Sequence, residues 1–476
     1  MKRRTAENIF LSSKSGQNRT DSSPLRSTKL ASLDPASRRN PDGLRLPPLS
    51  PPLPRQPERL FRKAAMASPG TALTSSVASD SSPKPSTVSH RLLRRYLSHL
   101  QVGTLTVTLP SGASMRHEGA GAGPEAVLVI RRWRALWRMM LAGDLGLARA
   151  YMDDDCCSND IRALLNLGAQ NGAALAKAAS GSLLSRCLER MRHSRRVNTR
   201  RGSRRNIAAH YDLGNEFYAL WLDSGMNYSS ALFTRDDETL EDAQDAKLRR
   251  VVELLDLKPD QSILEIGCGW GPLVERLIER HDCHVTGLTL SAEQLEFAEA
   301  RLRHRATAKN CDLRLQDYRD VEGRYDRIVS IEMLEAVGAR YWSTYFDKLR
   351  QSLTDNGVAV LQAITIAESR FEDYQRRSDF IQCYIFPGGM LPTMEIIRRE
   401  AARAGLRLVG HESFGGSYAR TLAEWRRRFL HIWLDIEALG FDIRFKRMWE
   451  YYLSYCEVGF QVGAINVSLL KLVPSR

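Results

Sequence analysis

Three glycines at alternate positions, Gly267, Gly269 and Gly271, follow an apolar run in the segment I-L-E-I-G-C-G-W-G-P that begins at Ile263. This pattern predicts a strand that enters a turn too tight for side chains and then a helix. Glycine adopts positive φ without strain and lets a ligand approach bare backbone. The spacing differs from the G-x-G-x-x-G pattern of dinucleotide-binding proteins. We therefore expect an α/β domain with a ligand at this turn, although a glycine turn without a ligand is the plainer alternative.

The charge beside the turn narrows the choice of ligand. Glu265 stands near the end of the predicted strand, where a carboxylate suits a positively charged group. The sulfonium and amino groups of S-adenosylmethionine (SAM) carry such charge. SAM therefore fits this position better than NAD does.

The stretch from Leu240 to Gly410 alternates predicted helices and strands. Strands are expected at 262–266, 284–288, 312–316, 327–331 and 357–364, and helices at 240–257, after Gly271, Ser291 and Trp342, and at 393–404. This alternation predicts a mostly parallel, Rossmann-like sheet, at whose carboxyl edge ligands bind. The residues expected to converge there are Glu265, Thr289, Asp317 and Glu335.

Polar residues follow the second and third of these strands. Thr289, Leu290 and Gln294 lie where a ribose would lie, one strand from the glycine turn. Ser291 also predicts a helix N-cap, with Gln294 completing a capping box. After the third strand, Asp317 offers an acceptor for an adenine amine and Tyr318 a ring to stack on it. Each signal is weak alone, but their order along successive strands favours a SAM site.

The remaining chain divides by composition. Its 476 residues predict two domains and a tail. The Ser-, Pro- and Arg-rich residues 1–89 are predicted to be disordered, with a transit peptide or a later start at Met66 as alternatives. Residues 90–170 are expected to form a small α+β domain, 171–209 a basic linker, and 210–476 the methyltransferase domain.

Positive charge is concentrated in two segments. Residues 1–90 contain 15 Lys and Arg against 6 Asp and Glu, and residues 186–205 contain 9 Arg against one Glu. The formal net charge of the whole chain is +14, so the rest is slightly acidic. Two local basic segments suit an anionic surface, either lipid head groups or nucleic acid.

The cysteines and the apolar runs indicate the cellular compartment of the protein. The 8 cysteines form no C-x-x-C pair or regular framework, which indicates reduced thiols in the cytoplasm. No apolar run reaches the length of a membrane-spanning helix, so a peripheral membrane contact is expected.

In the small domain, Trp133, Leu136, Trp137, Met140 and Leu141 recur at helical spacing, and we expect this stripe to be core.

Eight motifs along the chain, the glycine turn among them, carry a family resemblance. They are H-Y-D-L-G-N-E-F-Y, M-N-Y-S-S, I-L-E-I-G-C-G-W-G, L-T-L-S-A-E-Q, L-Q-D-Y-R-D, Y-D-R-I-V-S-I-E-M-L-E-A-V-G, Y-I-F-P-G-G-M-L-P and F-K-R-M-W-E-Y-Y-L. Together they resemble the cyclopropane-fatty-acyl-phospholipid synthase family, which includes mycolic-acid methyltransferases and 10-methyl-branching enzymes. The resemblance is tight from His210 onward and extends to residues 90–167, which are similar to the smaller N-terminal domain.

The resemblance implies methyl transfer from SAM to a cis double bond in a phospholipid acyl chain. In cyclopropane formation, a bound bicarbonate then removes a proton from the new methyl group and the ring closes. Family matching implies SAM contacts at Tyr228, Ser229, Gly267, Gly269, Thr289, Leu290, Gln294, Tyr318 and Ile331. Glu335 and Tyr418 match residues that hold bicarbonate, with help from the backbone of Ile364.

The chain departs from the family pattern at the expected bicarbonate site. Ser230 replaces the usual cysteine, and Ala336 and Gln362 replace usual histidines. Serine and glutamine still hydrogen-bond an anion, but neither titrates near pH 7 as histidine does. Ring closure is therefore in doubt, and the carbocation can lose another proton to give a methylene branch. The E-A-V-G and Q-A-I-T segments resemble that branch-forming subgroup.

The expected partners are a phospholipid surface and unsaturated acyl chains, with no nucleic acid, and a homodimer is left open. Candidates for an acyl tunnel, each also typical of ordinary core, are Phe380, Tyr384, Ile385, Phe386, Trp425, Phe429 and Trp433. Two other classes stay open. A nucleic-acid methyltransferase would use the basic segments to hold phosphate, and a non-enzymatic binding module would explain Ser230 and Gln362.

Overall fold

The computed structural model describes residues 93–94, 97–172, 174, 213–305 and 308–475. The predicted tail, most of the predicted basic linker and the H-Y-D segment that begins at His210 lie outside the described residues. The domain boundaries given above stay predictions. No helix among the described residues is long and apolar enough to span a membrane.

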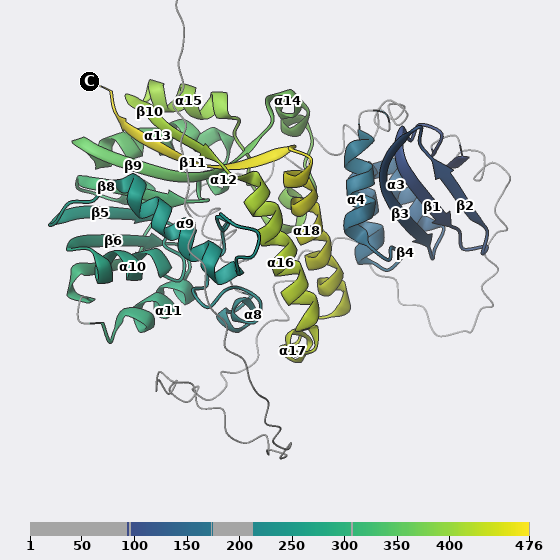
Figure 1. The fold of residues 1–476 in the computed structure, drawn as a ribbon, viewed down its shortest axis with the longest axis horizontal. Coiled ribbons are helices and arrows are strands. Elements are labelled where there is room, and N and C mark those ends of the chain that lie inside the picture. Colours follow the sequence, from purple (N-terminus) through teal and green to yellow (C-terminus); the bar gives the residue numbers. More distant parts are fainter. Residues whose placement is uncertain (1–92, 95–96, 173, 175–212, 306–307, 476) are drawn as a thin grey trace, which may run out of the picture. The chain divides into compact units, whose positions relative to one another are not determined.

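A four-stranded sheet forms the first part of the described chain (Figure 1). Its order is β2-β1-β3-β4, from β1 (Val102–Thr108), β2 (Ser114–Glu118), β3 (Gly121–Ile130) and β4 (Cys156–Cys157). Helices α3 (Arg134–Met152) and α4 (Ile161–Gln170) accompany it. The five-residue β2 was not predicted, because its S-M-R-H-E sequence is polar on both faces.

The apolar stripe at the start of α3 is core only in part, although the sequence predicted core throughout. Trp133 and Leu136 are half-buried against the hydrophobic core, whereas the other three residues are not. Trp137, Met140 and Leu141 are 61%, 56% and 61% exposed. The helix instead turns Ala135 inward, fully buried, and it kinks at Gly143, whose φ is +50°. Small residues let the helix lie close to its sheet, so the large apolar side chains of the other face point outward.

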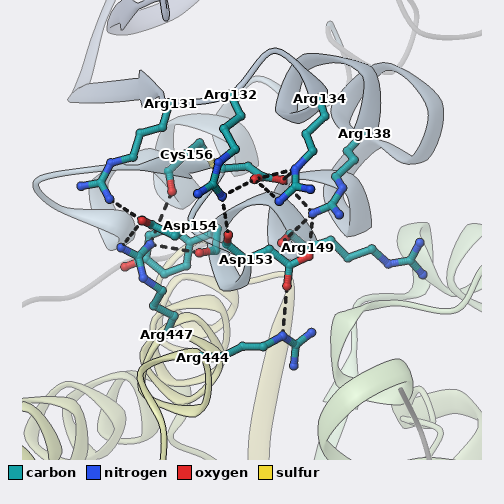
Figure 2. Close-up of polar contacts among 12 residues, drawn as sticks. Arg131, Arg132, Arg134, Arg138, Arg149, Asp153, Asp154, Cys156, Arg444 and Arg447 are labelled. Atoms are coloured by element: carbon teal, nitrogen blue, oxygen red, sulfur yellow. Dashed lines mark hydrogen bonds and ion pairs between the residues drawn. The ribbon is translucent and has the colours of Figure 1, made fainter. Parts of the chain in front are cut away.

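An acidic corner after α3 gathers several arginines (Figure 2). The fully buried carboxylate of Asp155 pairs with Arg132, Arg134 and Arg138 at 3.0, 2.7 and 2.9 Å. Helix α18 (Ile443–Gln461) supplies two further arginines: Arg444 lies 3.0 Å from Asp153 and Arg447 lies 2.5 Å from Asp154. These ion pairs tie the α3–β4 corner to α18.

A seven-stranded sheet forms the second part, in the order β10-β11-β9-β8-β5-β6-β7. Its strands are β5 (Gln261–Ile266), β6 (Cys283–Thr289), β7 (Cys311–Leu315), β8 (Tyr325–Ile331), β9 (Leu353–Ile366), β10 (Leu406–Ser413) and β11 (Ile465–Pro474). Strands β5 to β9 run parallel to one another, and β11 runs antiparallel between β9 and β10. The five predicted strands and the α/β fold class are confirmed, whereas β10 and β11 were not predicted.

Helices pack around this sheet and on one another (Figure 1). They are α8 (Asn215–Ala219), α9 (Leu240–Leu255), α10 (Pro272–Arg280), α11 (Ala292–Leu302), α12 (Leu334–Val337), α13 (Trp342–Ser352), α14 (Glu368–Arg376), α15 (Met394–Arg403), α16 (Gly415–His431), α17 (Trp433–Ala438) and α18. Short 3₁₀ turns cover Ala308–Asn310, Tyr318–Asp320 and Ala339–Tyr341, and Ile381–Ile385 is a π-helical turn. Helices α16 and α18 lie side by side before β11 completes the sheet.

An aromatic cluster joins α8, α16 and α18. Trp221, just after α8, lies 5.7 Å from Trp425 of α16 and 6.3 Å from Trp449 of α18, measured between ring centroids. The candidate tunnel residues Phe380, Ile385, Trp425, Phe429 and Trp433 are buried, and Tyr384 and Phe386 are half-buried against the same cluster. All seven thus serve as core here, and an acyl tunnel stays a prediction.

Candidate active site

The glycine turn lies at the carboxyl end of β5, as predicted. Gly267, Gly269 and Gly271 have φ of +85°, +55° and +81°, values that residues with a Cβ rarely adopt. The amides of Gly267 and Cys268 both donate to the carbonyl of Leu288 at 2.9 Å, which fixes the turn to the end of β6. A Cβ on Gly269 would meet nothing within 4 Å. The turn therefore offers open backbone to a ligand.

Glu265 provides a buried carboxyl group beside this turn. The residue is only 3% exposed, and its Oε2 atom has no hydrogen-bond partner among the described residues. Burial raises the pKa of its carboxyl to about 8, opposed by the charge of Lys247. A buried carboxylate oxygen without a partner suits an incoming cation. The residues present thus fit SAM, whose sulfonium and amino groups carry that charge.

Lys247 is a buried cation that the sequence analysis missed. Its ammonium donates to Ser229 Oγ at 3.0 Å and to Asn227 Oδ1 at 3.4 Å. Burial lowers its pKa to about 8, while the charges of Glu332, Asp223 and Glu265 raise it. One signal could have revealed it: Lys247 falls on the buried face of α9, at helical spacing from Leu240 and Val251.

The predicted ribose residues are joined by a hydrogen bond. The Thr289 hydroxyl donates to Gln294 Oε1 at 2.9 Å, and both residues are buried. Ser291 is the N-cap of α11, confirming that prediction, because its hydroxyl accepts from the Gln294 amide. The capping box is wrong: the Gln294 side chain bonds to Thr289 instead of turning back to Ser291.

A small cavity lies beside the predicted adenine residues. It has a volume of about 30 Å³ and is lined by Leu290, Asp317, Tyr318, Arg319, Met333, Ala336 and Val337. The Tyr318 hydroxyl is buried without a hydrogen-bond partner among the described residues. Asp317 accepts from Arg319 Nε at 2.8 Å and Nη2 at 2.6 Å, so its carboxylate already has a cationic partner. The role of Asp317 toward adenine stays a prediction.

The remaining predicted cofactor residues lie on the other side of the turn. The Tyr228 hydroxyl lies 3.0 Å from that of Tyr452 on α18. The Ser229 carbonyl accepts from Gln244 Nε2 at 2.8 Å. Ile331 ends β8 and pairs with Gln362 of β9.

The predicted catalytic residues surround a glutamate that sequence analysis missed. Ser230, Gln362 and Tyr418 all hydrogen-bond to Glu332, in the turn between β8 and α12. The predicted Glu335 is one helical turn away, and its carboxylate accepts from the amide of Ile364. Burial and the charge of Glu332 raise the pKa of Glu335 to about 8. The repeat of glutamate in E-M-L-E was the available signal for Glu332.

This arrangement suits chemistry on cations. The charges of Asp223, Glu265 and Glu332 raise the pKa of Lys247, and Glu335 lies beside Glu332. A second cation, the guanidinium of Arg301, donates to the carbonyl of Trp270 in the glycine turn at 3.1 Å. Fixed negative charge in a dry site stabilises positive charge that develops during a reaction. Among the described residues, no group of three or more His, Cys, Asp or Glu could hold a metal ion.

Comparison with known proteins gives the family. The model of the mycolic acid cyclopropane synthetase family matches residues 198–470. The chain belongs to this family. It is therefore a methyltransferase-fold enzyme of the cyclopropane synthase type, and the Rossmann-like fold predicted from the sequence is confirmed.

Individual relatives within the family are close enough to align over most of the chain. Tuberculostearic acid methyltransferase UfaA1 of Mycobacterium tuberculosis is 37% identical over 395 residues, which cover 81% of this chain and 91% of the relative. Cyclopropane-fatty-acyl-phospholipid synthase of Escherichia coli K12 is 35% identical, over 71% of this chain and 85% of the relative. The crystal structure of mycolic acid cyclopropane synthase CmaA1 with SAH and CTAB superposes with a TM-score of 0.53 at 31% identity, covering 56% of this chain and 97% of that one.

Proposed function

We propose that this protein transfers the methyl group of SAM to the cis double bond of an unsaturated phospholipid acyl chain. SAM supplies an electrophilic methyl group on a positively charged sulfur. The observation that carries the proposal is the buried carboxyl of Glu265 beside the glycine turn, whose Oε2 atom has no hydrogen-bond partner among the described residues. The site can hold a cationic methyl donor and then the carbocation that methyl transfer leaves on the lipid.

Different residues of the chain would bind SAM and shield the carbocation. The backbone at Gly267 and Gly269 and the carboxylate of Glu265 would hold the donor, with Thr289 and Gln294 beside its ribose. Tyr228 and Trp425, whose ring centroids lie 5.3 Å apart, form an aromatic wall near Ser229. Such rings stabilise a nearby cation through their π-electrons and keep water from the carbocation.

The family match and the hydrogen bonds around Glu332 argue against a nucleic-acid methyltransferase and against a non-enzymatic binding module. The family match covers the catalytic part of the chain and lends no support to a nucleic-acid methyltransferase. A binding module would have no need for Gln362 and Tyr418 to hydrogen-bond to a buried carboxylate, that of Glu332. We therefore retain the lipid methyltransferase.

The product distinguishes two outcomes of this reaction. We expect incubation with SAM and a dioleoyl phospholipid to release S-adenosylhomocysteine and to give a methylene-branched acyl chain, because Ala336 and Gln362 replace the histidines of the ring-closing pattern. Proton NMR of the lipid separates the products, which have equal mass: vinylidene protons mark the branch and upfield protons mark a cyclopropane ring. Ring protons would contradict the branched product, and unchanged lipid would contradict the proposed function.

The exposed face of α3 is our candidate for membrane contact. Trp137, Met140 and Leu141 form an outward apolar stripe, and Arg131, Arg132 and Arg134 stand half-exposed at the start of the same helix (Figure 2). Apolar side chains flanked by arginine are typical of helices that lie in the interface of an anionic bilayer. The linker predicted to contact head groups lies outside the described residues, so α3 is the surface that the structure offers.

Polar replacement of this stripe should weaken membrane binding. We expect the triple variant Trp137→Ser, Met140→Ser, Leu141→Ser to lower binding to phosphatidylglycerol vesicles by at least about tenfold, because three apolar side chains no longer enter the bilayer. Cosedimentation with vesicles measures this. Leu434→Ser on α17, at a residue that is 77% exposed, is the matched control and should bind as the unchanged protein does. Equal binding by all three proteins would rule out α3 as the contact.

A further inference from the structure

The Glu332 carboxylate lies where the family resemblance places a bicarbonate ion. Tyr418 donates its hydroxyl to Oε2 at 2.6 Å. The Ser230 amide and Gln362 Nε2 donate to Oε1 at 2.8 and 2.7 Å. These three residues were predicted from the sequence to form the bicarbonate site, and here their donors meet on a side chain of the protein itself.

Bicarbonate does not fit beside this carboxylate. An anion needs donors, and those of Tyr418, Ser230 and Gln362 are taken up by Glu332. The amide of Ile364, the last donor predicted for the site, is taken up by Glu335. A bound bicarbonate would also face two carboxyl groups, and like charges in a dry site repel strongly. The residues present therefore exclude the ion that the family pattern implies.

The backbone of Glu332 is held in a conformation that favours glycine. Its φ is +50°, which strains a residue that has a Cβ. Its amide donates to the carbonyl of Gln362 at 2.8 Å and fixes this conformation. Strain of this kind persists where a side chain must be aimed at a functional site. Here it aims the carboxylate at Tyr418 and Gln362.

We propose that Glu332 takes the place of bicarbonate as the base that completes the reaction. This inference rests on the proposed lipid methyl transfer. Three neighbouring donors, from Tyr418, Ser230 and Gln362, act as positioning residues that hold the carboxylate toward the methylated chain. The base is thus a side chain of the protein, and the reaction needs no dissolved bicarbonate.

The reaction proceeds by methyl transfer, hydride migration and removal of a proton. The π-electrons of the alkene form a bond to the methyl carbon while the sulfur–methyl bond breaks and leaves its electrons on sulfur. The neighbouring chain carbon becomes a cation. For a methylene branch, the hydrogen on the methylated carbon migrates to that cation with its electron pair. Glu332 then takes a proton from the methyl group, the C–H electrons form the new double bond, and the carboxyl later returns the proton to solvent.

The hydrogen bonds favour a negative charge on Glu332 over one on Glu335. Glu332 accepts from Tyr418, Ser230 and Gln362, whereas Glu335 accepts from the amide of Ile364, and its Oε2 has no hydrogen-bond partner among the described residues. Burial raises the pKa of both carboxyl groups; the three hydrogen bonds and the charge of Lys247 oppose this at Glu332, and the charge of Glu332 adds to it at Glu335. The three donors therefore hold Glu332 as the carboxylate that can accept a proton.

Two substitutions and added bicarbonate test this inference. In buffer freed of carbon dioxide, we expect the unchanged protein to keep its rate of lipid methylation within twofold of the rate with bicarbonate. Glu332→Gln should lose about 10²- to 10⁴-fold in rate, the usual contribution of a general base, and bicarbonate should not restore it. Glu332→Gly should lose as much but recover with bicarbonate, because it vacates the donors and suits the positive φ. Glu322→Gln, an exposed glutamate outside the site, is the matched control and should keep full activity.

A binding measurement separates this inference from the proposed function. NMR of ¹³C-labelled bicarbonate should detect binding to Glu332→Gly and none to the unchanged protein, whatever the lipid assay gives. Bicarbonate binding by the unchanged protein, bicarbonate-dependent turnover, or a Glu332→Gln rate within tenfold of the unchanged protein would each overturn the inference. Absence of lipid methylation by every protein, alongside the expected binding pattern, would overturn the proposed substrate and leave the exclusion of bicarbonate supported. Equal SAM affinity of the variants checks that they are folded.

Discussion

Replacing Trp221 with alanine should lower the free energy of unfolding by about 3–5 kcal/mol, the usual cost of removing a buried tryptophan. The side chain is fully buried, with ring centroids of Phe217, Tyr218 and Trp425 each 5.7 Å away. Its Nε1 atom has no hydrogen-bond partner among the described residues, so the loss would come from packing alone. The midpoint of urea denaturation measures it.

A second tryptophan provides the control. Trp137→Ala removes the same atoms from an exposed position and should change stability by no more than about 0.5 kcal/mol. Trp221→Phe keeps an aromatic ring in the cluster and should lie between the two. Comparable losses for Trp221→Ala and Trp137→Ala would mean that α3 packs its outer face against another part of the protein.

Glu265→Gln should weaken SAM binding and stabilise the protein without SAM. Loss of a charge-assisted contact costs about 1.5–3 kcal/mol, or roughly 10- to 100-fold in affinity. Isothermal titration with SAM and with S-adenosylhomocysteine locates the contact. A larger loss for SAM would place Glu265 near the sulfonium, equal losses would place it at the amino group, and unchanged affinities would contradict its role in the site.

The stability change follows from the sign of the pKa shift. The carboxyl pKa is raised to about 8 in the folded protein, against 4.5 for the free side chain. The folded state therefore holds a proton that the unfolded state has lost between those values, and its stability falls as the pH rises from 4.5 to 8. Glutamine does not titrate, so the variant should lack this contribution to the decline. At pH 8 we expect it to be more stable by roughly 4 kcal/mol. A variant that is less stable at pH 8 would show that another group holds the Glu265 charge in place.

The parallel half of the sheet could be predicted because its signals are local. Most of the strands β5 to β9 contain an apolar run, and a helix with a glycine turn or a capping residue such as Ser291 follows several of them. The strand β11 is also largely apolar, but it lies outside this alternation of strands and helices. Its partners β9 and β10 are set by contacts distant in sequence. The Trp137 stripe was misjudged for the same reason: helical spacing identifies an apolar face but not whether anything covers it.

The candidate site also contains residues that the sequence predicts and residues that it does not. Residues at strand ends, such as Glu265 and Thr289, follow from topology, and the structure brings them to one edge of the sheet. The hydrogen bonds of Glu332 do not follow from the sequence, because they depend on a left-handed backbone at one residue and on donors from three separate segments. Lys247 is similar, since only the folded protein places its ammonium beside Ser229.

The position of β11 has a consequence for the order in which the protein can be made. This strand lies between β9 and β10 and pairs with Gln362 through Leu469. Until it is synthesised, β10 has no neighbour and the β9 segment that carries Gln362 and Ile364 is an open edge. The ribosome must therefore finish almost the whole of this sequence before the catalytic half of the site is rigid, whereas the glycine turn can fold much earlier.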